Sequence, residues 1–260
     1  MRLKQHIKEG YYPPGTERSV NVPIDDAIKL IKQHCKSALS AYKSGKVVYR
    51  GVGMGDTNFM FIQPSKFTRA SANTTNLYTT LIDGSSKWKE YPKRSKSIIC
   101  TTSFDSAQNY GRLYIVLPVD GYKFGVCPRF DMWASFDDSI NDSLDTFNDS
   151  VEYIKNRLGV DFNMRSGLKT YSDLVKLCKM MDKAFKEYDD EVDYEWMKWY
   201  KGDFLKLFDQ LLDPAKNHFK ISKDINNLPR SRNEVWTDSD CYMVALGWTQ
   251  VGYNIESLIE

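Results

Sequence analysis

The stretch VVYRGVGMG, residues 47–55, joins an apolar run to a tyrosine–arginine pair and then to three alternating glycines. The apolar run is typical of a buried strand, and the glycines predict that the strand ends there. Arg50 therefore stands where a strand opens, beside backbone that a ligand could approach closely. Because a guanidinium binds phosphate through two hydrogen bonds and stays charged at neutral pH, Arg50 is a candidate anion-binding residue. The alternative is an arginine that holds a carboxylate within the fold.

These glycines do not fit the dinucleotide-binding turn of a doubly wound fold. That fingerprint requires GxGxxG, a helix directly after it and an acidic residue about 20 positions later. GVGMG (51–55) has a different spacing, and DTNFMF (56–61) is typical of extended chain. Arg50 thus remains the feature with which this segment could bind an anion.

The bulk composition fits an enzyme-sized globular protein. The chain has 260 residues, of which 42% are hydrophobic, and its formal net charge is +2. A net charge this small does not create an electrostatic field over the whole molecule that would attract nucleic acid or a membrane. Any anion-binding site must therefore come from a local group of charges. The five cysteines are scattered without a CxxC pair, which favours reduced, buried thiols over disulfides or zinc. With no run of 18 apolar residues, we expect a soluble cytoplasmic protein with no membrane partner.

Hydrophobic periodicity divides the chain into two textures. The strand-like runs are 46–52, 59–62, 97–102, 112–119, 122–128, 233–237 and 241–248. Two hairpins are predicted among them, one closed by VDGY (119–122) and the other by DSD (238–240). The rest of the periodic sequence has the hydrophobic spacing of helices.

The helical runs lie before and after the first group of strands. One helix of about 20 residues is expected from 24 to 42, with Pro23 in its first turn. Further apolar stripes predict three more helices, at 144–158, 170–188 and 196–211. The second of these opens with Thr170 and has Asp173 in the position of a capping box. We therefore predict an α+β fold in one domain, 1–260, with a helical insertion at about 137–225.

Two further segments carry chemically useful side chains at the edges of predicted strands. SIICTTSFDSAQNYG (97–111) is an apolar strand that ends in the hydroxyl triplet Thr101, Thr102 and Ser103, followed by Phe104. RSRNEVWTDSD (230–240) places Glu234 at the start of a late strand. In chain order the protein thus offers a cation, a hydroxyl triplet and a carboxylate.

This ordered set resembles the ADP-ribosyltransferase family. One branch of that family has an arginine on its first strand, Ser-Thr-Ser on its second and Gln/Glu-x-Glu before a late strand. The helix, loop and YRG strand of residues 27–51 and the NEVWT strand (233–237) are also similar. The resemblance covers about 25–130 and 230–248. It implies a split, mostly antiparallel β-sheet core with an N-terminal helix, and NAD as the substrate without any metal.

The resemblance also implies a role for each residue of the set. The catalytic residues would be Glu234, Thr101, which orients the glutamate, and Arg50. A fixed carboxylate suits this reaction because loss of nicotinamide leaves an oxocarbenium-like sugar.

The same resemblance implies an NAD-binding set around the first two strands. Arg50 would bind the diphosphate or the nicotinamide ribose, and the backbone of Gly51 would hold the nicotinamide amide. Thr102 and Ser103 would complete the strand end, and Phe104 could stack on nicotinamide.

Two positions depart from the pattern of the family. The triplet is Thr-Thr-Ser, and Arg232 stands where Gln or Glu would bind and activate the acceptor. Arginine cannot act as a base at neutral pH, so Arg232 and Asn233 favour a phosphate-bearing or otherwise anionic acceptor. The implied acceptor is a macromolecule, either protein or nucleic acid. The alternative is a catalytically inactive module of the same fold that binds a nucleotide or a partner.

Other segments have competing interpretations. Glu195 is a competitor for the carboxylate role, although it lies in helical texture. Residues 69–80 could line a nucleotide cleft, but their Asn and Thr content favours a turn. Residues 87–96 interleave Lys and Arg with Trp88 and Tyr91, which could contact nucleic acid, although a solvated basic loop is favoured.

Two broader expectations concern partners and origin. The helical block could be an assembly face, as the surplus aromatics Trp196 and Trp199 suggest. The Lys-, Asn-, Asp- and Tyr-rich composition resembles that of proteins from large tailed bacteriophages, which implies a location in the host cytoplasm.

Overall fold

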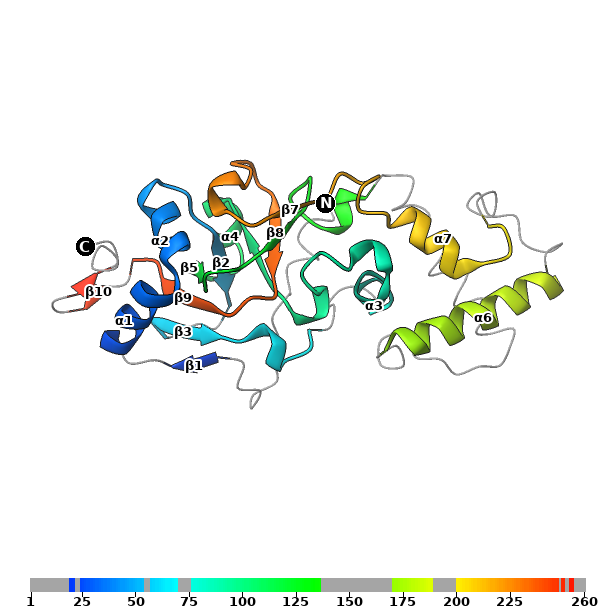
Figure 1. Cartoon of the computed structure of the whole chain (residues 1–260), viewed down its shortest axis with the longest axis horizontal. Helices are drawn as coiled ribbons and strands as arrows, with labels where there is room; N and C mark the ends of the chain where they lie inside the picture. Colours follow the sequence, from blue (N-terminus) through cyan, green and yellow to red (C-terminus); the bar gives the residue numbers. More distant parts are fainter. Residues whose placement is uncertain are drawn as a thin grey trace.

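The computed structural model of the chain describes residues 19–21, 24–53, 57–69, 76–136, 170–188, 200–247, 249–250 and 253–254. Nine strands of this part form one antiparallel sheet (Figure 1). In sheet order they are β1 (Ser19–Asn21), β3 (Phe59–Ile62), β9 (Cys241–Ala245), β5 (Arg112–Pro118), β2 (Tyr49–Val52), β4 (Ile98–Thr101), β8 (Glu234–Thr237), β6 (Phe124–Val126) and β7 (Lys220–Ser222). Two short strands, β10 (Thr249–Gln250) and β11 (Tyr253–Asn254), pair with each other.

Six α-helices accompany the sheet within the described residues. They are α1 (Ile24–His34), α2 (Lys36–Lys43), α3 (Leu77–Gly84), α4 (Phe104–Gln108), α6 (Tyr171–Tyr188) and α7 (Phe204–Leu211). The predicted α+β class is therefore confirmed, and each of the seven predicted strand runs contains a strand. The strands β1, β7, β10 and β11 were not predicted.

The sheet consists of two halves that meet in the middle. β2 pairs with β5 along its whole length, and β4 pairs with β8 in the same way. Between β2 and β4, however, the register consists of the single pair Tyr49 and Thr101. The halves β1-β3-β9-β5-β2 and β4-β8-β6-β7 are thus joined at one row of residues.

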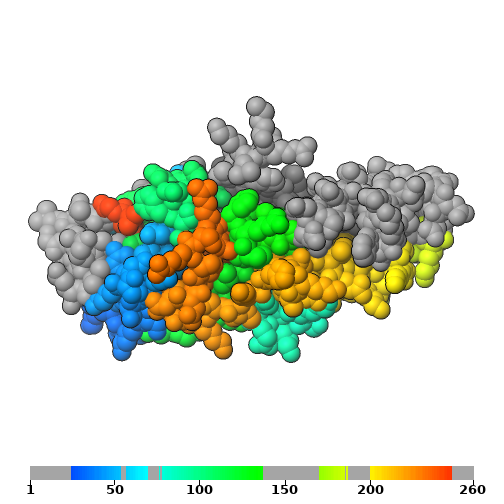
Figure 2. Space-filling view, turned by 90° about the horizontal axis from the view of Figure 1, so that it is seen from above, coloured from blue at the N-terminus to red at the C-terminus, as the bar shows by residue number. Residues whose placement is uncertain are grey.

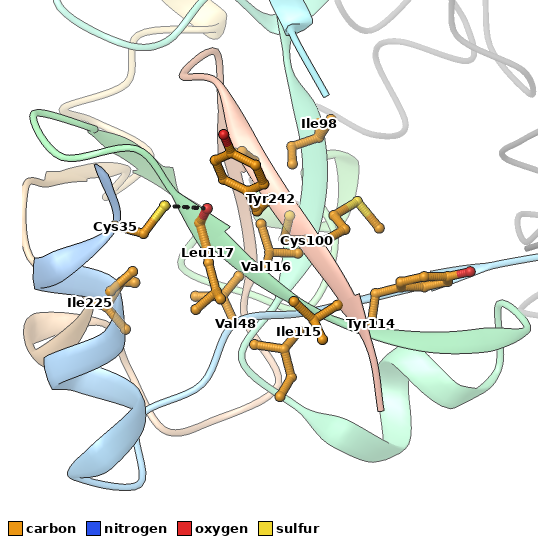
Figure 3. Close-up of a cluster of buried hydrophobic side chains, with 14 of the residues drawn as sticks. Cys35, Val48, Ile98, Cys100, Tyr114, Ile115, Val116, Leu117, Ile225 and Tyr242 are labelled. Carbon is orange, nitrogen blue, oxygen red and sulfur yellow. Dashed lines mark hydrogen bonds between the residues drawn. The ribbon is translucent and has the colours of Figure 1, made fainter. Parts of the chain in front are cut away.

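A hydrophobic core lies between the sheet and the helices α1 and α2. Consecutive side chains of β5 and β9 lie in it together with residues from the helices, so these two strands at the centre of the larger half are buried on both faces. Figure 3 shows Cys35, at the junction of the two helices, turned toward Leu117. Its thiol donates a hydrogen bond to the Leu117 carbonyl at 3.4 Å.

A second core joins α3, α6 and α7 to the other half of the sheet. Ile99 of β4 and Trp236 of β8 pack there with Trp88 and with the apolar faces of the helices. The indole of Trp236 donates to the Pro92 carbonyl at 2.9 Å, so its polar atom is satisfied although the side chain is buried. In Figure 1, α6 and α7 lie at one end of the molecule, and α3 lies between them and the sheet.

The predicted helix at 24–42 is two helices, because the chain bends at Cys35, which has φ −118° and ψ 37°. The carboxylate of Asp120 accepts from the backbone N–H of Lys36 at 3.1 Å and of Ser37 at 2.9 Å. Asp120 also donates its own N–H to the His34 carbonyl at 2.7 Å. The bend gives Asp120 access to the first N–H groups of α2, which a continuous helix would use internally.

Both predicted hairpins are wrong. β5 pairs with β2 and β9, not with β6, and β8 pairs with β4 and β6, not with β9. At VDGY the Asp120 carboxylate binds α2, as described above. At DSD, Asp238 accepts from the Lys93 N–H at 3.1 Å and Asp240 from the Gln63 amide at 3.0 Å. Both turns carry the chain from one half of the sheet to the other.

The predicted helical insertion at 137–225 is partly corrected. α6 confirms the helix at 170–188, and its capping box forms, with the Asp173 N–H donating to Thr170 Oγ1 at 3.2 Å. α7 begins at Phe204 instead of 196 because Gly202 has φ 80° and Asp203 is the N-cap. Lys220–Ser222 is a strand paired with β6, so helical structure ends before it. The predicted helix at 144–158 lies outside the described residues.

Candidate functional site

The register of the sheet brings two of the predicted catalytic residues together. Thr101 of β4 lies opposite Tyr49 of β2 on one side and opposite Glu234 of β8 on the other. Directly opposed residues on antiparallel strands share a face, with Cβ atoms about 5 Å apart. Tyr49, Thr101 and Glu234 therefore form one row across the junction of the two halves.

Glu234 is buried and forms an ion pair with Arg94. Its Oε1 lies 2.7 Å from Arg94 Nη2, and the two side chains are 10% and 2% exposed. The thiol of Cys127 also points to this oxygen, at 3.8 Å. Since a buried carboxylate is costly unless it is paired, the guanidinium favours the ionised form of Glu234.

Arg94 is a functional candidate that the sequence did not reveal. It lies in a short 3₁₀ helix, Arg94–Lys96, whose first two N–H groups donate to the Asp83 carboxylate at 2.5 and 2.9 Å. Its guanidinium carbon lies 5.4 Å from the centre of the Trp236 ring, a cation–π distance. Anchored by Asp83 and Trp236, Arg94 holds the Glu234 carboxylate in a fixed position.

The hydroxyl triplet ends β4 and begins α4. Thr101 Oγ1 accepts from the Ser103 N–H at 3.1 Å, and Ser103 Oγ accepts from the Ser106 N–H at 3.2 Å as the N-cap of α4. Thr102 donates its hydroxyl to the Ser231 carbonyl at 2.5 Å. Because Thr101 Oγ1 is an acceptor in this turn, its hydroxyl proton is available for a further acceptor on the Glu234 face.

Arg50 lies one residue beyond the row. Since successive strand residues point to opposite faces, the register places Tyr49 opposite Thr101 and turns Arg50 to the other face of β2. The Arg50 guanidinium, which is half-buried, donates to the Ile99 carbonyl of β4. Arg50 thus crosses the gap between the two halves of the sheet.

The structure explains the glycine at position 51 by a packing contact that the sequence did not indicate. A Cβ atom at this position would lie 2.1 Å from the Ala107 carbonyl oxygen and 2.7 Å from Tyr110 Cβ. The space beside Gly51 is therefore filled by α4 and the turn that follows it. On that side close packing of α4 on β2, rather than approach by a ligand, requires the glycine.

Phe104 lies at the surface beside the row. Its side chain is 40% exposed, and its ring meets that of Tyr49 edge to face at 5.9 Å. An exposed aromatic face next to Thr101 is a suitable surface for stacking a planar ring.

The two predicted acceptor-binding residues have different environments. Arg232 is exposed, whereas Asn233 is buried and donates its amide to the Cys127 carbonyl at 2.7 Å. The Asn233 amide oxygen also accepts from the Ser231 hydroxyl. Asn233 thus fixes the loop that carries Arg232.

Two of the favoured interpretations of other segments are corrected in part. In the 69–80 segment, α3 replaces the predicted turn from Leu77 onward, with buried Tyr78, and residues 70–75 lie outside the described ranges. In the 87–96 segment Trp88 and Arg94 are buried, and Lys87 pairs with Asp213 at 2.9 Å. Trp88 packs in the second core and Arg94 pairs with Glu234, whereas Lys89, Glu90 and Lys93 of this segment are exposed.

Other predicted residues lie outside the described part. Glu195, Trp196 and Trp199 fall between the described ranges 170–188 and 200–247. In the described ranges no cluster of three or more His, Cys, Asp and Glu side chains is arranged to hold a metal ion. No helix of those ranges is both long enough and apolar enough to cross a membrane.

Comparison with protein-family models, with curated proteins and with solved structures finds no match to this chain.

Proposed function

We propose that the protein is an NAD-dependent ADP-ribosyltransferase, a glycosyltransferase that transfers ADP-ribose from NAD to a macromolecular acceptor. The observation that carries this proposal is the row in which Thr101 lies between Tyr49 and Glu234. The row lies where the two halves of the sheet part, beside an exposed aromatic ring and a half-buried arginine. A hydroxyl, a carboxylate and a cation from three distant segments thus lie on three adjacent strands.

The reaction requires a fixed negative charge near the sugar. The bond between ribose C1′ and the nicotinamide nitrogen breaks, and nicotinamide leaves as a neutral molecule with the electron pair. The acceptor atom then bonds to C1′ and loses a proton. A carboxylate held near C1′ stabilises the positive charge that develops on the ribose. We assign this role to Glu234.

Arg94 supports the role of Glu234 in two ways. The ion pair keeps Glu234 ionised, which the developing cation requires, and it fixes one carboxylate oxygen so that the other has a defined direction. Thr101, whose oxygen accepts from the Ser103 N–H and which lies opposite Glu234, would orient the same carboxylate. Pre-organised groups of this kind lower the barrier because they need not rearrange during the reaction.

Arg50 and Phe104 are the proposed contacts to NAD. Phe104 would stack on the nicotinamide or on the adenine ring, beside the row. Arg50 points to the other face of β2 and donates to the Ile99 carbonyl, so it would bind phosphate only through the gap between β2 and β4. Gly51 keeps only a backbone role, because α4 occupies the space beside it.

A second candidate is a module that binds a nucleotide or a partner without turnover. The same Arg94–Glu234 pair favours it, because the guanidinium already neutralises the carboxylate on which catalysis would depend. Calorimetry with NAD and mass spectrometry after long incubation separate the two functions. Binding with no free nicotinamide supports the module, and stoichiometric nicotinamide supports the enzyme.

The test of the proposed function uses NAD labelled in the adenylate phosphate and separate pools of protein, DNA and RNA. We expect one pool to become labelled. One nicotinamide should be released from NAD for each ADP-ribose transferred. Glu234→Gln should lose this release. Glu90→Gln is the matched control for it, because Glu90 is an exposed glutamate outside the row. If no pool supports nicotinamide release above the rate in buffer, the proposed function is wrong.

A further inference from the structure

Two surface loops meet at the start of β8, next to Glu234. The Glu234 N–H donates to the Arg129 carbonyl at 3.2 Å, and the Asn233 amide donates to the Cys127 carbonyl at 2.7 Å. Ser231 is tied to the end of β4 through the Thr102 hydroxyl. Figure 2 shows the chain near residue 230 as an orange band at the surface, between the blue-green and green surfaces of the earlier segments. The loops 127–131 and 230–233 therefore form one fixed surface.

This surface has three exposed arginines, namely Arg129, Arg230 and Arg232. The nearest acidic side chain in the loops is Asp131, whose carboxylate accepts from the N–H groups of Trp133 and Ala134 at 2.7 and 3.1 Å. Asp105 on α4 is also exposed, and Glu234, which follows the second loop, is paired with Arg94. For a chain with a net charge of only +2, three arginines within these loops are a local concentration of positive charge.

An exposed aromatic ring belongs to the same loops as these arginines. Phe130 is 53% exposed, more than any other large hydrophobic side chain in the described ranges, and it directly follows Arg129. Phe104, 40% exposed, follows the Thr102 and Ser103 pair at the adjoining strand end. Arginines that meet phosphates, with aromatic rings between them on which bases stack, are the surface by which proteins bind single-stranded nucleic acid.

We propose that the loops 127–131 and 230–233 bind single-stranded nucleic acid, with Arg129, Arg230 and Arg232 on the phosphates and Phe130 stacked on a base. Arginine suits these contacts because it binds phosphate bidentately and cannot lose its charge. The proposal rests on the proposed function only in identifying the bound strand as the acceptor of ADP-ribose.

Binding is measured without NAD, by fluorescence anisotropy of a labelled 12-nucleotide DNA and of the RNA of the same sequence. Three phosphate contacts predict that log K falls with log salt concentration with a slope of about −2. Replacement of all three arginines by Gln should abolish this slope and the binding. Phe130→Ala should weaken binding about 10-fold or more, because it removes one stacked base.

The matched control replaces three exposed lysines of α1 and α2, Lys29, Lys32 and Lys43, by Gln. It removes the same charge from another surface, so binding should stay within about twofold of the wild type. The inference is wrong if the wild-type protein does not bind either strand at 50 mM salt. It is equally wrong if the control loses as much affinity as the arginine variant.

Failure of this inference differs from failure of the proposed function. Arginine-dependent binding without release of nicotinamide would support the nucleic-acid-binding surface and contradict the transferase function. Labelling of the protein pool, with no oligonucleotide bound, would support the transferase function and contradict a nucleic-acid acceptor.

Discussion

At the scale of single residues, the site depends on one buried ion pair. Arg94 and Glu234 come from different segments, and both are buried at the junction of β8 with the second core. Removing one partner of such a pair leaves an unpaired buried charge and costs about 3–5 kcal/mol. Replacing both by uncharged residues avoids most of that cost.

We predict that Arg94→Met and Glu234→Gln will each lower the free energy of unfolding by about 3 kcal/mol. The double variant should be more stable than the sum of the single effects implies, with a coupling energy of at least about 1 kcal/mol. Urea denaturation of the wild type, both single variants and the double variant measures this cycle. Strictly additive effects would show that the two side chains do not interact.

The sequence identified Thr101 and Glu234 but not Arg94, the more buried partner of the ion pair. Glu234 and Thr101 were predicted from motifs at strand ends, and the register brings them together. Arg94 lies in a lysine- and arginine-rich stretch that has the composition of a solvated loop. Its burial depends on Glu234 and Trp236, which are distant in sequence, so no local pattern could indicate it.

At the scale of elements, the packing of α4 on β2 defines the edge of the site. Gly51 lies against the Ala107 carbonyl, and Ser103 caps the helix directly after β4. The helix thus closes the sheet where β2 and β4 part. Phe104, the first residue of the helix, is thereby held beside Tyr49.

Gly51→Ala should destabilise the protein by about 3 kcal/mol, because its methyl group would overlap the helix backbone, which cannot move alone. Gly53→Ala is the matched control, since the nearest atom to its Cβ would be the Tyr110 carbonyl oxygen at an ordinary 3.8 Å. Thermal unfolding of both variants tests the difference. Equal stability of the two would mean that α4 is not packed on β2 as described.

The turns explain why the order of the strands could not be predicted. Asp-Gly and Asp-Ser-Asp are good local turn signals, yet their carboxylates bind α2, Lys93 and Gln63 instead of closing hairpins. The positions of the strands follow from the local hydrophobic period of the sequence, and they were predicted well. The pairing of the strands depends on long-range contacts, about which the hydrophobic period carries no information.

At the scale of the whole molecule, two cores and one divided sheet account for the placement of all five cysteines. Cys35, Cys100 and Cys241 lie in the core under α1 and α2, and Cys127 and Cys178 lie in the other. All five are free and buried, as their scattered positions predicted. Burial raises the pKa of Cys35, Cys100 and Cys178 to about 12.

Thiol reactivity should therefore report unfolding of the whole protein. The thiolate is the reactive form, and a pKa of about 12 leaves roughly one thiol in ten thousand ionised at pH 8. We expect no cysteine to react with an aromatic disulfide reagent in the native protein, and all five to react in guanidinium chloride. Rapid reaction of any thiol without denaturant would contradict the described packing.

The most direct measurement concerns Glu234. NAD affinity by calorimetry and nicotinamide release should be measured on wild type and on Glu234→Gln, at a temperature where circular dichroism shows both to be folded. We predict that the Kd for NAD will change by less than about threefold, while release falls by about 10²- to 10⁴-fold. Release by the folded variant at the wild-type rate would contradict a catalytic role for this carboxylate.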